Sequence, residues 1–423
     1  MRKDRRRTVG VGITALTAAA LVLGGSGSAL AQDSTLRISM GSPGEAGIAV
    51  WEAIAADFEA ANAGVDVQFD FQDDDLYQTI GLQNALNSPT PPDIYFEWTG
   101  SRMAQRHADG FAADLTEYTT GPLAGIWDDG VWPAASVDGK VVLVPHTADV
   151  TNVLWYNVPL FAEQGLTPPT TFDELLAVCD ALVAADIIPI ATGNKDLWAA
   201  GNWLSHMVSR VVGEESYDAL LSGEGKFANP EWEQAFGYIA QLREHSCVNE
   251  SANSIADNEG AELFFQGIAA MHPIGSWLVS WAVTDAPELE FDFVNLPAMP
   301  EGSLGDQGSA IGVETGYIVN AKSANIPLAV DFLAFLNSPD NVKRFVTEAE
   351  IIPIASSVAE AGVDGRSLRL GELLASAPAV VLPPDTGYDL ETANQLYAAE
   401  AAVLGGQATP AEALANLDAT LGR

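Results

Sequence analysis

Residues Leu154–Leu176 read LWYNVPLFAEQGLTPPTTFDELL, and this stretch sets out a strand, a turn and a helix in immediate succession. The apolar run Asn152–Tyr156 predicts a buried strand. A short helix follows and stops at Gly165, and two prolines then turn the chain. Thr171 and Glu174 have the spacing of a capping box, in which each side chain bonds the other residue's backbone N–H. We therefore expect a second helix to open at Thr171.

The residues before this stretch alternate between strands and helices. We expect strands at Thr35–Met40, Val65–Phe71 and Asp93–Trp98, and helices at 45–62 and 76–86. This alternation predicts an α/β lobe with a largely parallel sheet. The segment from Asp114 to Lys140 is rich in Gly, Pro, Trp and acidic residues, so we expect a surface excursion there.

The residues after it predict a second and more helical lobe. Expected helices are 171–185, 197–212, 230–245 and 258–266, with short strands at 187–191, 268–272 and 291–295. A strand at 314–320, helices at 326–336 and 339–348, a candidate crossing at 351–354 and a mostly helical tail follow. A chain of 423 residues is too long for one comfortable core, so two lobes are expected.

The first residues are typical of an export signal. Five basic residues lie within the first seven, an apolar run covers Val9–Leu23, and Ala29–Ala31 has the small-x-small pattern of a cleavage site. The apolar run is shorter than the roughly 20 residues of a spanning helix. We expect residues 1–31 to be a signal peptide cleaved after Ala31. No cysteine follows that site, so we expect no lipid anchor and a periplasmic, secreted or cell-surface protein.

The composition is strongly acidic, with 57 Asp and Glu against 19 Lys and Arg and a formal net charge of −38. A negative surface repels phosphate backbones and anionic lipid heads, which argues against binding to nucleic acid or to a membrane surface. The acids are spread along the chain, so solubility or a salty habitat is a sufficient explanation for them.

The chain has two cysteines, Cys179 and Cys247. In an exported protein an oxidising compartment favours a disulfide between them. The alternative is a pair of buried thiols that never meet. Neither cysteine has a Cys-x-x-Cys partner, so redox catalysis is not expected.

Five segments together resemble a known family. These are Asp93–Gly100 (DIYFEWTG), Leu154–Leu176, Phe264–Trp277 (FFQGIAAMHPIGSW), Asn320–Asn337 and Gly406–Ala413. In this order they resemble family 1 extracellular solute-binding proteins of carbohydrate ABC importers, which include the maltodextrin binders. The resemblance implies the two-lobe α/β fold of periplasmic binding proteins, with a ligand cleft between the lobes and two to three crossing segments. Carried over, lobe one is 33–145 with 305–352, and lobe two is 146–304 with 353–423.

Tryptophans are the first candidates for the cleft, because indole rings suit the flat C–H face of a sugar. Trp98 ends a predicted strand, Trp198 opens a predicted helix, and Trp277 follows a Gly-Ser turn. The resemblance implies ligand contacts at Trp98 and Trp277. The alternative for each is core packing, which we expect for Trp51, Trp155 and Trp232. Trp281 is expected to bury the same helix face as Trp277.

Polar candidates would select the hydroxyl pattern of a sugar, because carboxylates and amides form directed hydrogen bonds. They lie at strand ends, helix starts and the crossing: Glu45, Glu97, Asp149, Asn194, Asp196, Glu314 and Tyr317, with Asp385 and Tyr388 as secondary candidates. Helix-dipole stabilisation is the alternative for Glu45, and a solvated hinge position is the alternative for Asp149.

The sequence carries no recognisable motif of catalysis. The sequence after residue 31 has no Gly-x-Ser-x-Gly elbow, no His-Glu-x-x-His and no phosphate loop, and its five histidines lack metal-ligand spacing. We therefore expect no enzyme activity, no cofactor and no metal. The expected function is capture of a sugar or oligosaccharide by lobe closure, as a monomer that delivers it to ABC permease subunits. The alternatives are a binder of a polyamine or amino compound, or a secreted glycoside-active enzyme, which needs only two carboxylates.

Overall fold

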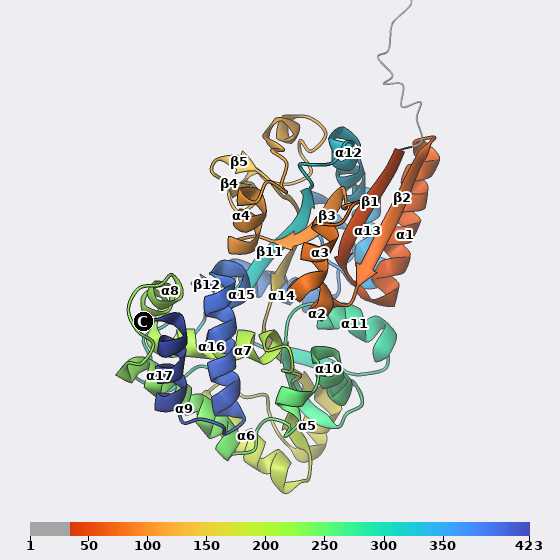
Figure 1. Cartoon of the computed structure of the whole chain (residues 1–423). Coiled ribbons are helices and arrows are strands. Elements are labelled where there is room, and N and C mark those ends of the chain that lie inside the picture. Colours follow the sequence, from red (N-terminus) through yellow and green to blue (C-terminus); the bar gives the residue numbers. More distant parts are fainter. Residues whose placement is uncertain (1–33) are drawn as a thin grey trace, which may run out of the picture.

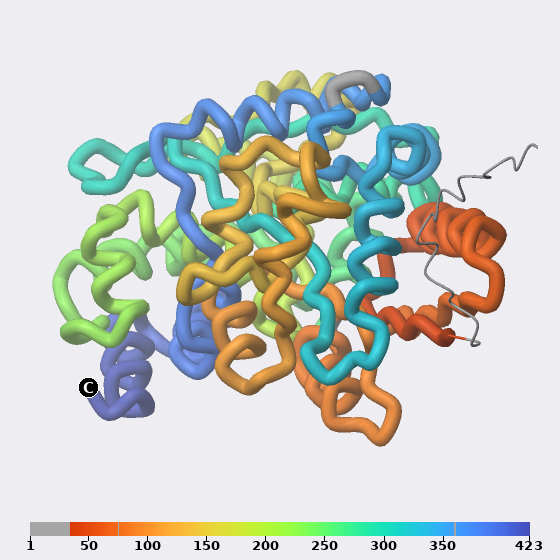
Figure 2. The backbone as a smooth tube through the Cα atoms, turned by 90° about the horizontal axis from the view of Figure 1, so that it is seen from above, coloured from red at the N-terminus to blue at the C-terminus, as the bar shows by residue number. Residues whose placement is uncertain are grey.

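The computed structural model describes residues 34–423, so the predicted signal peptide lies outside the described residues. The chain forms two α/β lobes, each built on its own sheet (Figure 1). Viewed from the first-lobe end, α1 and the C-terminal helix α17 lie on opposite sides of the molecule (Figure 2). No helix within residues 34–423 has the length and apolar character needed to cross a membrane.

The first sheet has the order β12-β11-β3-β1-β2, with β6 also paired to β11. Its strands are β1 (Ser34–Gly41), β2 (Val65–Gln72), β3 (Ile94–Trp98), β6 (Val144–Val150), β11 (Ala310–Val319) and β12 (Val380–Val381). Strand β1 pairs in parallel with β2 and with β3, as the sequence predicted. Strand β11 is antiparallel to both β3 and β6. A strand that returns late in the sequence therefore completes the sheet begun by the first three.

Helices cover this sheet around an aromatic core. They are α1 (Gly44–Ala61), α2 (Asp74–Leu76), the π-helix η1 (Tyr77–Gly81), α3 (Leu82–Leu86), α4 (Ser101–Ala108), α12 (Ile326–Leu336) and α13 (Pro339–Ala349). Trp51 of α1 is buried, as expected, and its ring centroid lies 5.2 Å from that of Tyr317 and 5.5 Å from that of Phe345. Edge-to-face aromatic contacts of this kind fix how α1 and α13 lie on β11.

The segment Asp114–Lys140 differs from its prediction. It contains only the short 3-10 helices η2 (Thr116–Thr120) and η3 (Asp129–Val131) and the strand β4 (Ser136–Val137), which pairs with β5 (Lys140–Val141). Leu115, Leu123 and Trp127 are nevertheless buried in the first-lobe core. The expected surface excursion is thus partly wrong, because widely spaced apolar residues anchor an irregular backbone without giving any periodic pattern.

The second sheet has the order β10-β7-β9-β8. Its strands are β7 (Val153–Asn157), β8 (Ile188–Ile190), β9 (Ala269–Ile274) and β10 (Phe291–Val294). Helices around it are α5 (Val158–Gln164), α6 (Phe172–Ala184), α7 (Trp198–Val212), α8 (Glu214–Leu221), α9 (Pro230–Glu244), the 3-10 helix η4 (Ala252–Ser254), α10 (Asp257–Phe265), α11 (Leu278–Asp285), α16 (Leu390–Leu404) and α17 (Pro410–Leu421). Trp155 and Trp232 are fully buried here, as expected.

Local predictions for this lobe are confirmed. Helix α5 ends at Gly165, whose φ of 66° is left-handed. Thr171 and Glu174 form the capping box: Thr171 Oγ1 accepts from Glu174 N at 3.2 Å, and Glu174 Oε2 accepts from Thr171 N at 3.2 Å. Cys179 of α6 and Cys247, just beyond α9, form the predicted disulfide. It links two elements that are 68 residues apart in the sequence.

Three segments pass between the two sheets. The first joins β6 to β7, the second joins β10 to β11, and the third runs from α13 through η5 (Ser356–Glu360), α14 (Gly365–Ser376), β12 and α15 (Pro384–Gly387) to α16. The third segment starts beside β6, where Ile354 N donates to His146 O at 2.7 Å. The candidate crossing at 351–354 pairs with β6 through a single bridge, between Pro353 and Thr147.

A buried arginine holds the second crossing segment against α7. Arg210 is fully buried, and its guanidinium donates to Ser309 O at 2.6 Å, Asn295 Oδ1 at 3.0 Å and Leu296 O. Burial lowers the pKa of Arg210 to about 10, which still leaves it charged at neutral pH. Helix α7 also carries Trp198, a candidate for ligand binding, as its first residue. Arg210 therefore connects the second crossing segment to the helix that positions this tryptophan.

Candidate ligand-binding site

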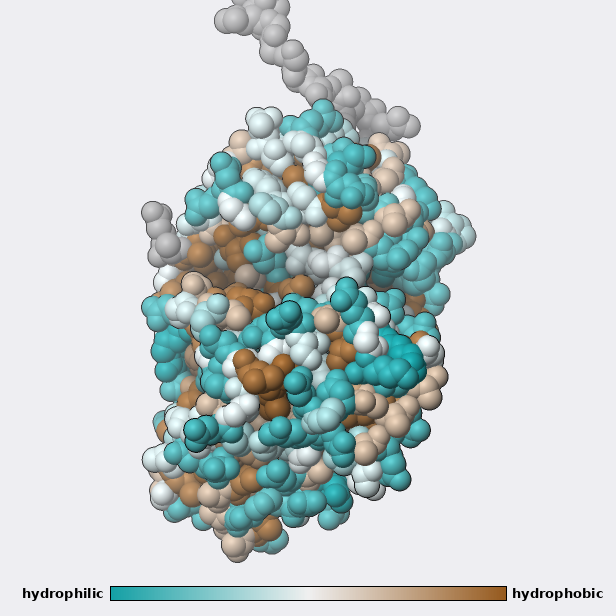
Figure 3. All heavy atoms as spheres, turned by 90° about the vertical axis from the view of Figure 1, so that its left-hand side faces the viewer, coloured by the Kyte–Doolittle hydropathy of each residue, from teal (hydrophilic) through white to brown (hydrophobic). Residues whose placement is uncertain are grey.

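A cavity of about 590 Å³ lies between the two lobes. Its wall is formed by residues of the first sheet, of second-lobe helices and turns, and of the first and third crossing segments. Met40, Phe96 and Trp98 lie on one side, and Trp198, Ser276 and Trp277 lie on the other. Figure 3 shows apolar surface gathered where the lobes meet. The volume falls within the range typical of pockets for small organic ligands.

Trp98 is the first-lobe aromatic platform. It is the last residue of β3 and is held at the sheet by pairing with Thr315 of β11. The Phe96 ring meets it edge-on at 4.8 Å, and the Arg102 guanidinium lies 4.7 Å from its ring centroid. Arg102 also donates to Gln78 O at 2.7 Å. The orientation of the Trp98 indole is therefore fixed by neighbours before any ligand arrives.

Trp198 and Trp277 form the second-lobe platform. Their ring centroids are 6.1 Å apart and their planes are inclined by 49°. A Cβ at Gly275 would lie 2.1 Å from Cζ3 of Trp277, so the Gly-Ser-Trp turn requires its glycine for this ring position. Trp281, one turn further along α11, also lines the cavity and is half-buried. The expectation that Trp281 is only helix packing is thus incomplete.

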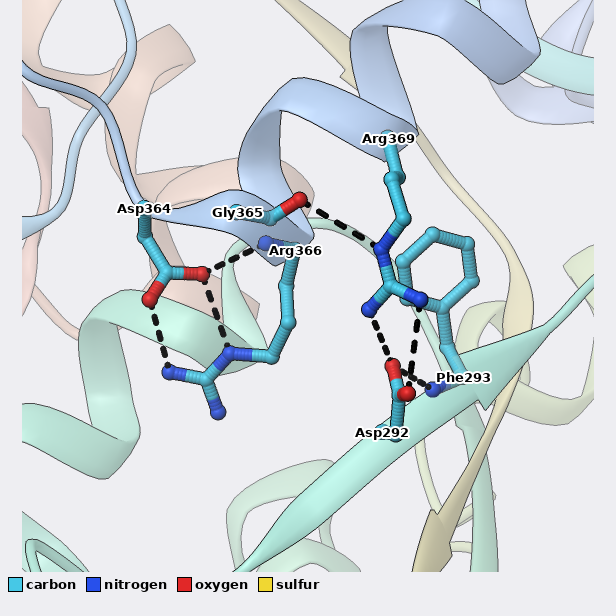
Figure 4. A network of polar contacts seen from close by, with 6 residues as sticks. All are labelled: Asp292, Phe293, Asp364, Gly365, Arg366 and Arg369. Carbon is cyan, nitrogen blue, oxygen red and sulfur yellow. Dashed lines mark hydrogen bonds and ion pairs between the residues drawn. The ribbon is translucent and has the colours of Figure 1, made fainter.

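Helix α14 supplies an apolar wall, including Leu370 and Leu374. Arg369 of α14 links it to β10 of the second lobe (Figure 4). Arg369 makes a bidentate ion pair with Asp292 of β10, in which Nη1 lies 3.3 Å from Oδ2, and its guanidinium lies 5.1 Å from the Phe293 ring centroid. Paired guanidinium and carboxylate groups hold a defined mutual orientation. The ion pair therefore holds this wall against the second lobe, while α14 also packs against β6 and β11 of the first sheet.

Asp149 lies on the cavity wall at the end of β6, next to the first crossing. Its Oδ1 accepts from Ser276 Oγ at 2.9 Å, and its Oδ2 accepts from Thr147 Oγ1 at 3.1 Å. Burial raises the pKa of Asp149, and the two hydroxyl donors partly offset that rise. The predicted hinge acid thus faces the cavity and bonds to a turn of the other lobe.

A buried polar cluster borders the cavity near α15. Asp385 is 6% exposed, and its Oδ1 has no hydrogen-bond partner among residues 34–423. Its backbone N–H donates to the Tyr397 hydroxyl at 3.2 Å, which itself donates to Asn202 Oδ1 at 2.6 Å. A Cβ at Gly201 would lie 2.2 Å from Tyr397 Cδ1, so this close approach of α7 and α16 needs a glycine. Burial raises the pKa of Asp385, and Arg102 acts against that rise.

The cavity wall is acidic. Asp74, Asp149, Glu350 and Asp385 line it, while no lysine or arginine of the described chain does so. His146 also lines it, but burial lowers its pKa to about 4, so this ring is neutral at physiological pH. The wall therefore offers indole faces, hydroxyls and carboxylates, and no formal positive charge.

The structure brings five of the ten primary site candidates to this cavity: Trp98, Asp149, Trp198, Trp277 and Tyr317. Of the two secondary candidates, Asp385 lines the cavity and Tyr388 does not. Tyr317 is 2% exposed and packs against Trp51, so its ring is chiefly part of the first-lobe core.

The other five lie off the cavity wall. Glu97 is fully buried and pairs with Arg106 at 2.8 Å. Glu45 is exposed in the first turn of α1. Asn194 is buried, where its Oδ1 accepts from Ala200 N and its Nδ2 donates to Asn253, so it stabilises the start of α7.

Asp196 is half-buried two residues before the start of α7, and Glu314 is half-buried on β11. Oε2 of Glu314 is buried without a hydrogen-bond partner in the described chain, and burial raises its pKa. Neither residue lines the cavity. Ligand contact by these five residues stays a prediction.

Sequence reasoning missed several wall residues, namely Asn202, Ser276, Ser280, Glu350 and Thr386. Ser276 had a signal, because it precedes Trp277 in a Gly-Ser-Trp turn. Glu350 has a positive φ of 53°, which marks a sharp end to α13 that no sequence pattern announced. Asn202 lies within a helix that is otherwise buried and had no distinguishing signal.

Comparisons with known proteins agree with this architecture. A protein from the thermophilic bacterium Caldanaerobius polysaccharolyticus, studied for xylan utilization, superposes with a TM-score of 0.83 at 21% identity. The match covers 92% of this chain and all of that one. At this identity the likeness shows the two-lobe fold.

Sequence relatives point the same way. An uncharacterised ABC transporter extracellular-binding protein of Pyrococcus horikoshii is 23% identical over 266 residues, which cover 62% of this chain and 58% of that protein. A probable sugar-binding periplasmic protein of Mesorhizobium japonicum is 30% identical over 200 residues, covering 46% and 45%. The chain thus matches about half the length of these curated relatives.

The family assignment rests on a longer match. The model of a family described as bacterial extracellular solute-binding protein matches residues 42–343, well over half of the chain. That region includes β3, the Gly-Ser-Trp turn and β11, which carry the aromatic platforms and the central strand. The chain therefore belongs to the family 1 bacterial extracellular solute-binding proteins, as the sequence resemblance implied.

Proposed function

We propose that this protein is the extracytoplasmic substrate-binding protein of an ABC importer, and that it captures a sugar or oligosaccharide between its lobes. The observation that carries the proposal is the distribution of indoles around one cavity. Trp98 comes from the first lobe, whereas Trp198, Trp277 and Trp281 come from the second. A sugar ring offers C–H faces to such platforms from both sides.

The polar groups between these platforms suit the rim of a sugar. Asp149, Asn202 and Asp385 present carboxylate and amide oxygens, and Ser276 and Ser280 present hydroxyls. Polar groups of this kind select among hydroxyl patterns, because a wrongly placed hydroxyl leaves a buried partner unsatisfied. The Mesorhizobium relative is described as a probable sugar-binding protein, and the Pyrococcus relative as an ABC transporter component.

Transport then follows from lobe movement. Three crossing segments connect the lobes, so a hinge closure about them would enclose a bound ligand. The closed protein would dock on membrane permease subunits as an exported monomer. Its two lobes would have the boundaries that the sequence predicts. The family is one of binding proteins, and we propose that no bond of the ligand is broken.

Isothermal titration calorimetry against neutral mono- and oligosaccharides tests this function, with amino acids and polyamines as competing classes. The expected result is saturable binding to at least one saccharide. Recovery of the saccharide after incubation, with no new reducing ends, separates a binder from a glycoside-active enzyme. Binding only to polyamines or amino acids, or release of shorter sugars, would overturn the proposal.

The acidic wall supports a second candidate ligand, namely a cationic non-sugar solute such as a polyamine. Such a ligand has no flat C–H face to match the four tryptophans, so the sugar is favoured. The same titrations decide between the two.

A further inference from the structure

We propose that the preferred ligand of this cavity is an amino-bearing saccharide, and that Asp385 selects it by receiving the ligand's ammonium group. This inference rests on the proposed sugar-binding function and names the chemical class of sugar.

The first argument is the balance of charge around the cavity. Four carboxylates, those of Asp74, Asp149, Glu350 and Asp385, share a wall to which no Lys or Arg among residues 34–423 contributes. A neutral ligand enclosed there would bring no positive charge to these acids in a low-dielectric space. A ligand with a uronate or phosphate group would add to the repulsion, and one with an ammonium group would relieve it.

The second argument is the unsatisfied oxygen of Asp385. This side chain is more than nine-tenths buried, lines the cavity, and has no hydrogen-bond partner at Oδ1 in the described chain. A buried acceptor without a donor costs free energy that a ligand N–H can recover. The nearby cation, Arg102, lies over Trp98 and donates to Gln78 O, so its guanidinium already has other partners.

The third argument is that the charges of the ionised acids are only partly compensated in the absence of ligand. Burial raises the pKa of Asp149, Glu350 and Asp385, and the donors or cations near each of them only partly oppose that effect. An ammonium group beside them would stabilise their charged forms. Indole faces add to the same preference, because their quadrupole attracts cations.

Glu350 is the second acid of this wall that has a buried oxygen without a hydrogen-bond partner. Its Oε2 has no hydrogen bond within residues 34–423, but Arg366 partly balances its charge. The side chain is also less buried than that of Asp385. Asp385 is therefore the residue that should discriminate between ligands most strongly.

Calorimetry with matched sugars tests the inference on the full exported chain. Each set contains a neutral sugar together with its 2-amino, 2-acetamido and uronate derivatives. Separate sets are built on glucose, on galactose and on the β-1,4-linked dimer of each. The measurements are made at about pH 6, below the usual pKa of an aliphatic amine. In the series that binds, the amino sugar should bind about tenfold to a hundredfold more tightly than the neutral sugar, which is the range of a charge-assisted hydrogen bond. The uronate should bind most weakly.

Asp385→Asn then assigns the effect to one side chain. This isosteric change should remove most of the advantage of the amino sugar while changing the affinity for the neutral sugar by less than about threefold. Asp173→Asn, on the exposed face of α6, is the matched control and should leave both affinities unchanged. Circular dichroism melts establish that each variant is folded.

The possible outcomes separate the two proposals. Equal or tighter binding of the neutral sugar by the wild-type protein overturns the amino-sugar inference and leaves the sugar-binding function standing. An amino-sugar preference that survives Asp385→Asn overturns the role of Asp385. If no saccharide binds, whether or not a polyamine does, the proposed function itself is overturned.

Discussion

Ser276 Oγ donates a hydrogen bond of 2.9 Å to Oδ1 of Asp149, and this bond joins a turn of the second lobe to the strand that leaves the first. The same turn bonds the strand through its backbone, since Ser276 N donates to Val150 O at 2.8 Å. Asp149 lies near the end of β6, four residues before the chain enters the second lobe at the start of β7. The hinge and the cavity wall are thus built from the same residues.

Ser276→Ala should lower the free energy of unfolding by about 1–3 kcal/mol, because it removes a donor from a buried carboxylate. Ser280→Ala is the matched control. Its hydroxyl also lines the cavity but donates to the carbonyl of Trp277 in its own helix. Urea titration of both variants measures the difference. Equal destabilisation by the two changes would show that the bond to Asp149 contributes nothing particular.

Trp277→Ala should weaken sugar binding at least tenfold, about 1.4 kcal/mol, because the cavity loses one of its stacking faces. The melting temperature should be nearly unchanged, since Trp277 is only half-buried. Trp132→Ala is the control, being another half-buried tryptophan that does not line the cavity. Titration followed by intrinsic fluorescence measures both affinities. Wild-type affinity in Trp277→Ala would contradict the assigned platform.

Glu400→Gln should flatten the dependence of stability on pH. Glu400 is fully buried, accepts one hydrogen bond from Ser205 at 2.9 Å, and has a pKa raised well above 4.5 by burial. Above the pKa of about 4.3 that glutamate has in the unfolded state, the Glu400 carboxyl stays protonated in the folded state but loses its proton on unfolding. The free energy of unfolding therefore falls as the pH rises above that value.

The measurement for Glu400→Gln is urea denaturation at a series of pH values. The variant should be relatively more stable than the wild-type protein near neutral pH and should lose this advantage in acid. Glu412→Gln provides a contrast, because hydrogen bonds from Thr409 lower the pKa of Glu412. An unchanged pH profile in Glu400→Gln would contradict the assignment.

Removing the disulfide should destabilise the protein substantially. Cys179 and Cys247 close a long loop, for which the chain-entropy model gives about 4 kcal/mol. The double variant Cys179→Ala/Cys247→Ala should therefore unfold at a clearly lower urea concentration than the wild-type protein. Reductant should destabilise the wild-type protein and leave the variant unaffected. Equal urea midpoints would mean that the bond adds no stability.

The order of elements was predictable because the signals that set it are local. The capping box of α6, the glycine that ends α5 and the alternation of strands and helices all act within a few residues. Tryptophans at strand ends and helix starts were predictable for the same reason. Trp98, Trp198 and Trp277 meet at one cavity because the carboxyl ends and turns of both sheets face each other.

The remaining site residues depend on pairings that no local pattern reveals. Glu97, a predicted ligand contact, lies off the cavity wall and forms a buried ion pair with Arg106 of the following helix. Asn194 also lies off the cavity wall, and its Oδ1 accepts a hydrogen bond from Ala200 N at the start of α7. Asp385 reaches the wall only because the third crossing segment brings α15 to Gly100 and Ser101 of the first lobe, where Ser101 Oγ donates to Thr386 O at 3.0 Å. Such contacts follow from the tertiary fold.

A crystal structure of the protein with a bound saccharide tests the central claim most directly. The account predicts an intact sugar ring in the cavity between the lobes, stacked against Trp98 from one side and against Trp198 or Trp277 from the other. Density for a saccharide outside this cavity, or tryptophans that make no contact with the bound ring, would contradict it.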